Sequence, residues 1–424
     1  MRDLIVELWL PYGETEVVVR VPAENLLGVA DAKEPDVVPD PHAEVNRALE
    51  NPIGGVKLGN LVKAGCKIAI VVEDEIEPTQ RKAMLLTLLK RLNELGIENK
   101  TITVIAGHGL YKPARTEGLQ RLFGEGTADG VRVINHDPRG RGLLYIGKTT
   151  LKTKVYINRA FAEADLRILT GSVGFHPYAG YRGGRTGVLP AISGLSTIQH
   201  NCSLLVDPKA MPGNIDGNPV HLDMTEAAHL AGVHFILNVA TNAEGRIIKA
   251  FAGDMDKAFL EGAGFIDEVY KVPVERAADV VIVSPGGYGK DASLYEAFKV
   301  VNNVLGVVKD GGVVILVAEC SEGYGNEKFY DWVRGARSLK DVERMIRRGF
   351  VPGGEGAYYL LKALSRVKVI LVSVMPEYYS RDVFKLKTAR SVNEALRLAF
   401  KMIGRRGKVL VVPHGSTTLP SLQI

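Results

Sequence analysis

Short apolar runs without polar alternation recur along the chain, and segments with helical spacing separate them. The first two runs are KIAIVVED (67–74) and TITVIAG (101–107), and a helical pattern from Arg81 to Leu95 lies between them and stops at Gly96. A strand without alternation is buried on both faces, which is typical of a parallel sheet covered by helices on both sides. The sequence therefore predicts an α/β fold.

This pattern occurs twice, which predicts two domains. Further runs are expected to extend the first sheet, at 131–136, 154–158, 166–171 and 234–240. The pattern restarts around Gly262 to Pro273, and a second set of strands alternates with helices, at 279–287, 313–318, 367–374 and 408–415. We therefore expect two α/β domains, 1–265 and 266–424, with mostly parallel sheets and a cleft between them.

The amino-terminal segment has its own local signals. Residues 3–10 and 15–21 alternate around Pro11-Tyr12-Gly13, which predicts a hairpin, and Asp40-Pro41 opens a short helix. The alternating, charged start is not a signal peptide, and the chain has no apolar run long enough to span a bilayer. We therefore expect a cytoplasmic protein without a membrane partner.

Composition narrows the possible partners. The chain has 53 Lys and Arg against 48 Asp and Glu, a formal charge of only +5, and its basic residues are dispersed, so nucleic-acid binding is not expected. The three cysteines, Cys66, Cys202 and Cys320, lie far apart and form no CxxC pair, which argues against a disulfide framework or a structural zinc site. The expected partner is a small-molecule substrate; the oligomeric state is left open.

A glycine-rich stretch follows the run at 166–171. Residues 171–187 contain six glycines, with His176, Arg182 and Arg185 among them. Glycine is costly in backbone entropy and is kept where the chain turns tightly or something approaches its backbone. Guanidinium groups beside Gly183-Gly184 suggest that a ligand bound at this backbone is an anion such as phosphate. The alternative is a structural turn with solvated arginines.

Ligands of open α/β sheets bind beyond the carboxyl ends of the strands. Five predicted strand ends carry polar or glycine-rich tails, at Glu73-Asp74, 107–109, 171 onward, 284–288 and 319–323. Because three of these belong to the first domain and two to the second, the sequence predicts a site lined from both domains.

Several long motifs resemble the nickel-dependent lactate racemase family. They are GFHPYAGYRGGRTGVLPAISGLSTI (174–198), GNPVH (217–221), ALENPIG (48–54), SPGGYGKDASLYEAFK (284–299), ECSEGYGNEKF (319–329) and HGSTTLP (414–420). Members of this family use a nickel pincer nucleotide, a pyridinium mononucleotide that holds nickel through sulfur and carbon. The resemblance implies that a hydride moves from the substrate α-carbon to the pincer ring and back, while histidines exchange the hydroxyl proton.

The resemblance also implies roles for residues at matching positions. His176 keeps the place of one catalytic histidine, and Tyr111 stands where the other is expected, with His108 as an alternative. The cofactor is expected to contact Asp74, Arg182, Gly183, Gly184, Arg185, Thr186, Tyr295 and Glu296.

Other matching positions depart from the family pattern. Thr186 replaces the lysine that anchors the cofactor covalently, so binding is expected to be non-covalent. Cys202 replaces the histidine that binds nickel, and neighbouring His200 is a second candidate ligand. Glu77 replaces the substrate-binding arginine, which leaves Lys299 for substrate recognition.

The sequence thus predicts a lactate racemase-like racemase or epimerase of a 2-hydroxy acid or a related hydroxylated substrate. His176 and Tyr111 are unequal as bases. This favours epimerisation of a substrate with another stereocentre, because the two faces of such a substrate need not be equivalent. The alternative is a nucleotide- or metal-binding protein of the same fold without catalysis, because the residues at 77, 111, 186 and 202 all depart from the family pattern. A nicotinamide dehydrogenase is disfavoured, since the chain lacks a strand–GxGxxG–helix unit with a downstream acid.

Overall fold

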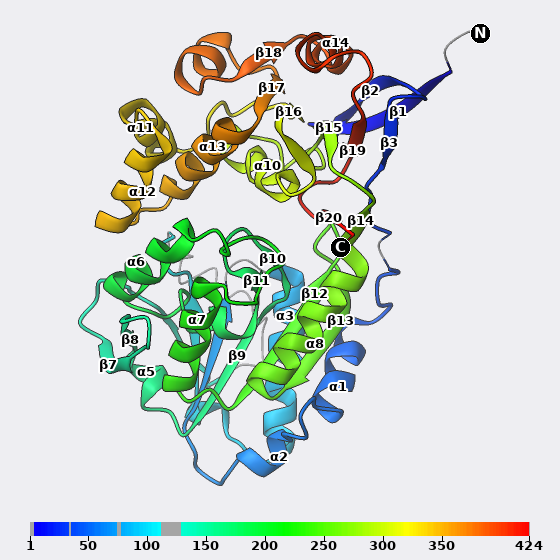
Figure 1. Cartoon of the computed structure of the whole chain (residues 1–424). Helices are drawn as coiled ribbons and strands as arrows, with labels where there is room; N and C mark the ends of the chain where they lie inside the picture. The colour runs from blue at the N-terminus through cyan, green and yellow to red at the C-terminus, as the bar shows by residue number, and fades with distance from the viewer. Residues whose placement is uncertain (1–3, 34, 74–77, 112–128, 424) are drawn as a thin grey trace. The chain divides into compact units, whose positions relative to one another are not determined.

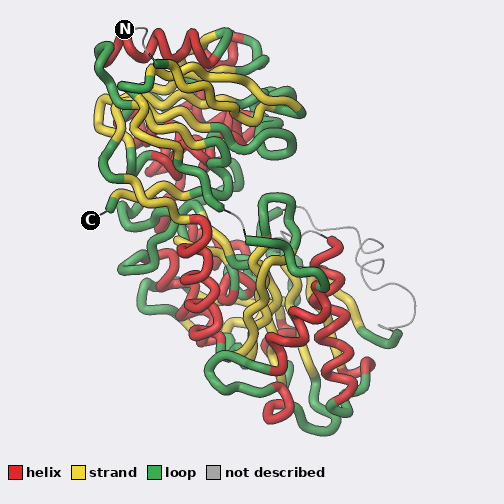
Figure 2. The backbone as a smooth tube through the Cα atoms, turned by 90° about the vertical axis from the view of Figure 1, so that its right-hand side faces the viewer, coloured by secondary structure: helices red, strands yellow, loops and turns green. Residues whose placement is uncertain are grey.

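A computed structural model describes residues 4–33, 35–73, 78–111 and 129–423 and divides the chain into two compact units (Figure 1). We call residues 34–269 the central unit, and residues 1–33 together with 270–424 the composite unit. Both units are layered α/β structures, with helices against sheets (Figure 2), as the apolar runs predicted.

The central unit contains a six-stranded sheet. In sheet order its strands are β13 (Ile247–Gly253), β12 (Phe235–Thr241), β9 (Leu166–Ser172), β4 (Ile68–Glu73), β5 (Ile102–Gly107) and β6 (Arg132–Asn135). Every pairing is parallel except that of β13 with β12. The helices are α1 (Pro41–Glu50), α2 (Leu58–Leu61), α3 (Pro78–Glu94), α5 (Arg159–Ala162), α6 (Leu195–Ser203), α7 (Pro219–Leu230) and α8 (Met255–Tyr270). Short 3₁₀ turns lie at Asn99–Thr101, Gly184–Gly187 and Leu204–Val206.

The core of this unit explains why its strands are apolar throughout. All six residues of β4 are buried, and Ile68 and Ile70 pack in one cluster with Leu88 of α3. Asp40 caps α1 by accepting from the backbone N–H groups of His42 and Ala43, as Asp40-Pro41 predicted. The continuous apolar runs are therefore the buried centre of the sheet.

One strand expected in the main sheet lies elsewhere. β8 (Lys154–Asn158) pairs antiparallel with β7 (Leu143–Lys148) in a separate two-stranded sheet. Only the short α5 and a few further residues separate β8 from β9. A parallel neighbour needs a crossover of about a dozen residues, so β8 cannot join the main sheet beside β9.

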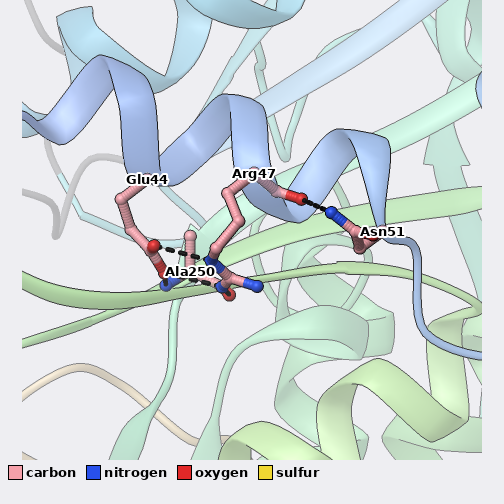
Figure 3. Close-up of polar contacts among 4 residues, drawn as sticks. All are labelled: Glu44, Arg47, Asn51 and Ala250. Atoms are coloured by element: carbon pink, nitrogen blue, oxygen red, sulfur yellow. Dashed lines mark hydrogen bonds and ion pairs between the residues drawn. The ribbon is translucent and has the colours of Figure 1, made fainter.

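The edge strand β13 was not predicted, and helix α1 covers it (Figure 3). The backbone N–H of Ala250 donates to Glu44 Oε1 over 2.8 Å, and Arg47 Nη2 donates to the Ala250 carbonyl oxygen over 3.0 Å. Arg47 also pairs with Glu44, and the Asn51 side chain donates to the Arg47 carbonyl. These contacts occupy backbone groups that an exposed edge would offer to another strand.

The composite unit contains a second six-stranded sheet, in which every pairing is parallel. In order its strands are β18 (Lys387–Ala389), β17 (Lys368–Val372), β16 (Val308–Val317), β15 (Ala278–Val283), β19 (Val409–Val412) and β3 (Leu26–Val29). Two small sheets pair β1 (Ile5–Tyr12) with β2 (Thr15–Pro22) and β14 (Lys271–Val274) with β20 (Leu419–Leu422). The helices are α9 (Leu294–Ala297), α10 (Lys299–Val304), α11 (Glu327–Gly335), α12 (Leu339–Arg348), α13 (Gly354–Arg366), α14 (Val392–Ile403) and a π-helical turn at Tyr378–Val383.

The amino-terminal segment differs from the expected domain boundaries. The predicted hairpin forms as β1 and β2, but residues 1–33 belong with 270–424 and not with a domain of residues 1–265. The reason is packing: β3 pairs with β19, and Leu10, Val19 and Val21 are buried in the same core as Val280 and Val411. In the described part of the chain, no helix has the length and apolar character needed to cross a bilayer.

Candidate functional site

The candidate site of the central unit lies at the carboxyl ends of neighbouring strands. β9, β4 and β5 are adjacent in the sheet, and their ends lead to Ser172, Glu73 and His108. The glycine-rich stretch continues from β9 as a small hairpin of β10 (Gly174–His176) and β11 (Gly180–Arg182). The topology thus brings Glu73, His108, Ser172 and the hairpin that carries His176 to one edge, where ligands of such sheets bind.

In the turn after this hairpin, backbone N–H groups donate hydrogen bonds to side chains of the protein itself. Gly183 has φ +102°, and a Cβ there would lie 2.9 Å from the end of the Asn238 side-chain amide. Its N–H donates to Thr186 Oγ1 over 3.0 Å, and that hydroxyl donates to Glu73 Oε1 over 2.7 Å. With the Asn238 amide oriented to satisfy both groups, its oxygen accepts from the Gly184 N–H over 2.8 Å. The backbone donors expected to hold a phosphate are therefore bonded within the protein.

Arg185 also differs from its predicted role. Its side chain is buried and donates to the carbonyl oxygens of Gly183, Ala179 and Tyr181 over 2.9–3.1 Å. The guanidinium carbon lies 4.0 Å from the centre of the Phe259 ring. Burial lowers the pKa of Arg185 to about 9. Arg185 thus holds the turn together from inside and does not present its charge to an anion.

Arg182 and Ser172, next to this turn, also have buried donors that bond no described residue, as Arg185 has at its Nε. Within the described residues, the buried Arg182 Nε and the buried hydroxyl of Ser172 have no hydrogen-bond partner. Arg182 lies opposite Gly174 in the hairpin, two residues beyond Ser172. Because a buried donor without a partner is costly, a ligand with acceptor oxygens would be stabilised here. Arg182, a predicted contact, and Ser172, which was not predicted, are therefore candidates for binding an anion.

His176 ends β10, and the backbone fixes its tautomer. The Ala179 N–H donates to His176 Nδ1 over 3.0 Å, and the Tyr178 N–H lies 3.4 Å from the same atom. The proton of the neutral ring is therefore on Nε2. The Tyr178 ring packs edge-on, with 4.4 Å between ring centres. In its neutral form His176 thus offers the Nε2 proton, and its predicted role as a base stays a prediction.

Tyr111, the predicted partner of His176, is 60% exposed, and its N–H donates to the carbonyl oxygen of His108. His108 itself is only 8% exposed. The structure therefore places the alternative residue, and not Tyr111, inside the protein.

The two candidate nickel ligands have different surroundings on α6. His200 is exposed, and its Nδ1 lies 2.7 Å from Thr153 Oγ1, which in turn contacts buried Asp223. Cys202 is buried, and its sulfur lies 3.8 Å from the hydroxyl of Tyr178, the neighbour of His176. Among the described residues, no three His, Cys, Asp or Glu side chains gather as a metal site. Cys202 is therefore the candidate on the His176 side.

The predicted residues of the composite unit lie together. Lys299 Nζ is 2.7 Å from Glu296 Oε2 and 5.0 Å from the centre of the Tyr295 ring. The Tyr295 hydroxyl donates to buried Glu355, and burial raises the pKa of that carboxyl. Sequence reasoning missed Glu355, whose only signal is an acid directly after Gly353-Gly354. Glu355 fixes the orientation of Tyr295.

Two sequence-predicted positions, Asp74 and Glu77, lie outside the described residues. A groove of about 610 Å³ runs along β6 in the central unit, and none of the predicted site residues is among its described lining residues. It is lined by Lys67, Lys100, Arg132 and Asp137, among others, and so reaches the amino ends of β4, β5 and β6. Ligands of open α/β sheets bind at the other ends of the strands, and we give this groove no role.

These observations define an α/β protein with unpartnered polar groups at the carboxyl edge of a parallel sheet, which is the usual place of a small-molecule site. Residues 12–213 match the lactate racemase N-terminal domain, and residues 274–419 match the lactate racemase C-terminal domain. The chain belongs to the lactate racemase family, which supports a racemase function.

Individual relatives cover nearly the whole chain. The lactate racemase of Thermoanaerobacterium thermosaccharolyticum is 33% identical over 97% of this chain and 98% of its own. That of Lactiplantibacillus plantarum is 30% identical over 97% of this chain and 99% of its own. The structure of the T. thermosaccharolyticum apoprotein matches with a TM-score of 0.88 at 32% identity, covering 98% of this chain and all of that one. A Thermotoga maritima protein, at a TM-score of 0.64 and 17% identity over 92% of this chain, shares the fold.

Proposed function

We propose that this chain is a racemase or epimerase of a 2-hydroxy acid or a related hydroxylated substrate, and that it acts by hydride transfer. The observation that carries the proposal is the match to lactate racemases along the whole chain, with His176 kept at the carboxyl edge of the central sheet. A substrate hydroxyl offers an acceptor oxygen, which suits the Nε2–H of His176, and the resemblance to the family implies Lys299 for the substrate carboxylate.

The proposed cofactor is a nickel pincer nucleotide, held without a covalent bond. Unpartnered buried donors fit an anionic group: Arg182 and Ser172 would bind its phosphate, and Cys202 would supply the protein ligand to nickel. Thr186 cannot serve as an anchor, because its hydroxyl is already bonded to Glu73 and Gly183. When bound, the cofactor supplies a hydride acceptor.

The chain's own residues then bind and orient the substrate. His176 donates a hydrogen bond through Nε2, with its ring held by Ala179 and Tyr178. In the composite unit, Glu355 holds Tyr295, and Lys299 lies over the Tyr295 ring. We assign the substrate carboxylate to Lys299.

The test supplies the purified chain with the pincer nucleotide and with single enantiomers of lactate and other 2-hydroxy acids. Chiral chromatography should show interconversion, and His176→Ala should reduce it by about 100-fold or more. Nickel content and the ultraviolet–visible spectrum report cofactor binding independently. Binding without interconversion would favour the non-catalytic alternative, which the changed residues Thr186 and Cys202 also suit. If the chain neither binds the cofactor nor interconverts the enantiomers, the proposal is refuted.

A further inference from the structure

His108 is a buried histidine without a partner. It follows β5 directly and is 8% exposed. Among the residues that the structure describes, neither Nδ1 nor Nε2 of its ring has a hydrogen-bond partner. Buried side-chain nitrogens are almost always bonded, so a ring with two unbonded nitrogens needs a specific explanation.

The backbone around His108 is tightly fixed. A Cβ on Gly107 would lie 2.8 Å from the Ala191 Cβ, and the Gly109 N–H donates to the Ala191 carbonyl oxygen. Ala191 belongs to the segment that leaves the glycine turn at 183–187, and its own N–H donates to Thr186. His108 is therefore held beside the candidate site and cannot easily turn away to find a partner.

His136, a neighbouring buried histidine, has the hydrogen bonds expected of a structural residue. The rings of His108 and His136 are 6.2 Å apart. His136 is 1% exposed, but its Nε2 lies 2.9 Å from the Ser193 carbonyl oxygen and its Nδ1 lies 3.4 Å from the Asn158 amide. Burial lowers the pKa of His136 to about 4, so it stays neutral and carries no charge against His108. Among the described residues, the fold thus provides hydrogen-bond partners for the ring of His136 and none for the ring of His108.

The two remaining candidates for a proton acceptor are less suited than His108. Nδ1 of His176 already accepts from the backbone, so its neutral ring offers only the Nε2 proton. The Tyr111 side chain is 60% exposed, and a phenol has a pKa of about 10 in water. A ring with both nitrogens unbonded can take either tautomer and can therefore accept a proton.

We propose that His108 contacts the substrate and accepts the proton of its hydroxyl group, the role that the sequence had assigned to Tyr111. This inference rests on the proposed function. In the step, the O–H bond breaks and an N–H bond forms on the imidazole. The O–H electron pair would become the second carbon–oxygen bond if a bound hydride acceptor took the α-hydrogen together with its own electron pair. When a hydrogen is restored to the α-carbon with its electron pair, the imidazolium would give the proton back to the same oxygen, so no net proton or electron is consumed.

The experiment compares His108→Leu, His136→Leu and Tyr111→Phe in the full chain. A buried ring without hydrogen-bond partners destabilises the ligand-free protein, so His108→Leu should raise the melting temperature by about 2–4 °C. His136→Leu removes a bonded ring and should lower the melting temperature. In the loaded enzyme, His108→Leu should reduce kcat by about 100-fold or more, and Tyr111→Phe should change it by less than about threefold.

Other outcomes have distinct meanings. A lower melting temperature for His108→Leu would assign His108 a structural role, and turnover that survives this substitution would exclude it from proton transfer; either result overturns the inference. Loss of turnover in Tyr111→Phe alone would return the role to Tyr111. If the unsubstituted chain converts no 2-hydroxy acid, the proposed function itself fails, and the stability comparison still shows whether the His108 ring lacks a partner.

Discussion

Arg182 and Arg185 lie three residues apart around the same glycine pair, but their guanidinium groups have different surroundings. The positive φ of Gly183 and Gly184 turns the chain so that Arg185 enters the interior and bonds three carbonyl oxygens. Arg182 is only partly buried, and no carbonyl bond of its guanidinium is seen among the described residues; the Nε atoms of both arginines are unpartnered there. The sequence shows two equivalent arginines, because their difference depends on the direction of the turn.

Arg185→Met should destabilise the central unit, since it leaves three carbonyl oxygens without a donor in a buried turn. The expected loss in the free energy of unfolding is about 3 kcal/mol, measured by denaturant titration. Arg182→Met is the matched control: it should leave this free energy within about 0.5 kcal/mol and instead weaken binding of an anionic ligand. Equal stability of the two variants would contradict the assignment.

His136 makes the stability of the central unit dependent on pH. Burial lowers its pKa from 6.5 to about 4, so the unfolded chain takes up the proton first. Its contribution is complete above pH 6.5 and is lost as the pH falls toward 4, by about 2 kcal/mol at pH 5. Unfolding titrations between pH 7 and 5 should show this loss, with a shallower slope in His136→Asn. An unchanged slope in that variant would exclude His136 as the source.

At the scale of single elements, α6 shows how a helix separates two adjacent candidates. Residues two positions apart on an α-helix point about 200° apart, so His200 and Cys202 cannot face the same ligand. His200 contacts Thr153, and Cys202 contacts Tyr178. Helical spacing alone identifies this separation, but only the packing shows which side belongs to the site.

Cys202→Ala should therefore abolish nickel retention by the cofactor-loaded protein, whereas His200→Ala should retain the metal. Metal analysis after gel filtration measures both, and we expect at least about a tenfold difference between the two variants. The opposite pattern, with nickel lost only from His200→Ala, would make His200 the ligand.

Sequence patterns predicted individual strands and helices better than the contacts between elements far apart in the chain. The apolar runs that became β4 and β5, and the Asp40 cap of α1, are local signals, and the structure confirms them. β8 has a strand-like sequence too, but its short connection to β9 excludes it from the main sheet. Glu355 was missed because its contact with Tyr295 joins residues 60 positions apart, a separation that no local pattern reports.

The chain as a whole is not divided at one point. Its first 33 residues complete the composite unit, although the central unit follows them in sequence. The Ala30 N–H donates to the Val411 carbonyl oxygen, and the Asn25 side chain donates to the carbonyl oxygens of Arg405 and Gly407. β3 (blue in Figure 1) thus belongs to the same sheet as β19 (red), and the hairpin, a separate two-stranded sheet, packs into the same core.

This division predicts how fragments of the chain behave. Residues 34–269 hold their own sheet and core and should unfold cooperatively when expressed alone. Residues 270–424 should aggregate, because loss of Leu10, Val19 and Val21 uncovers their core at a cost of roughly 1.5–3 kcal/mol for each side chain. Fusing residues 1–33 to that fragment through a flexible Gly/Ser linker should restore a soluble, cooperative unit, as followed by circular dichroism and size-exclusion chromatography. Cooperative folding of 270–424 without the amino-terminal segment would show that the hairpin and β3 only cover a sheet that is already stable.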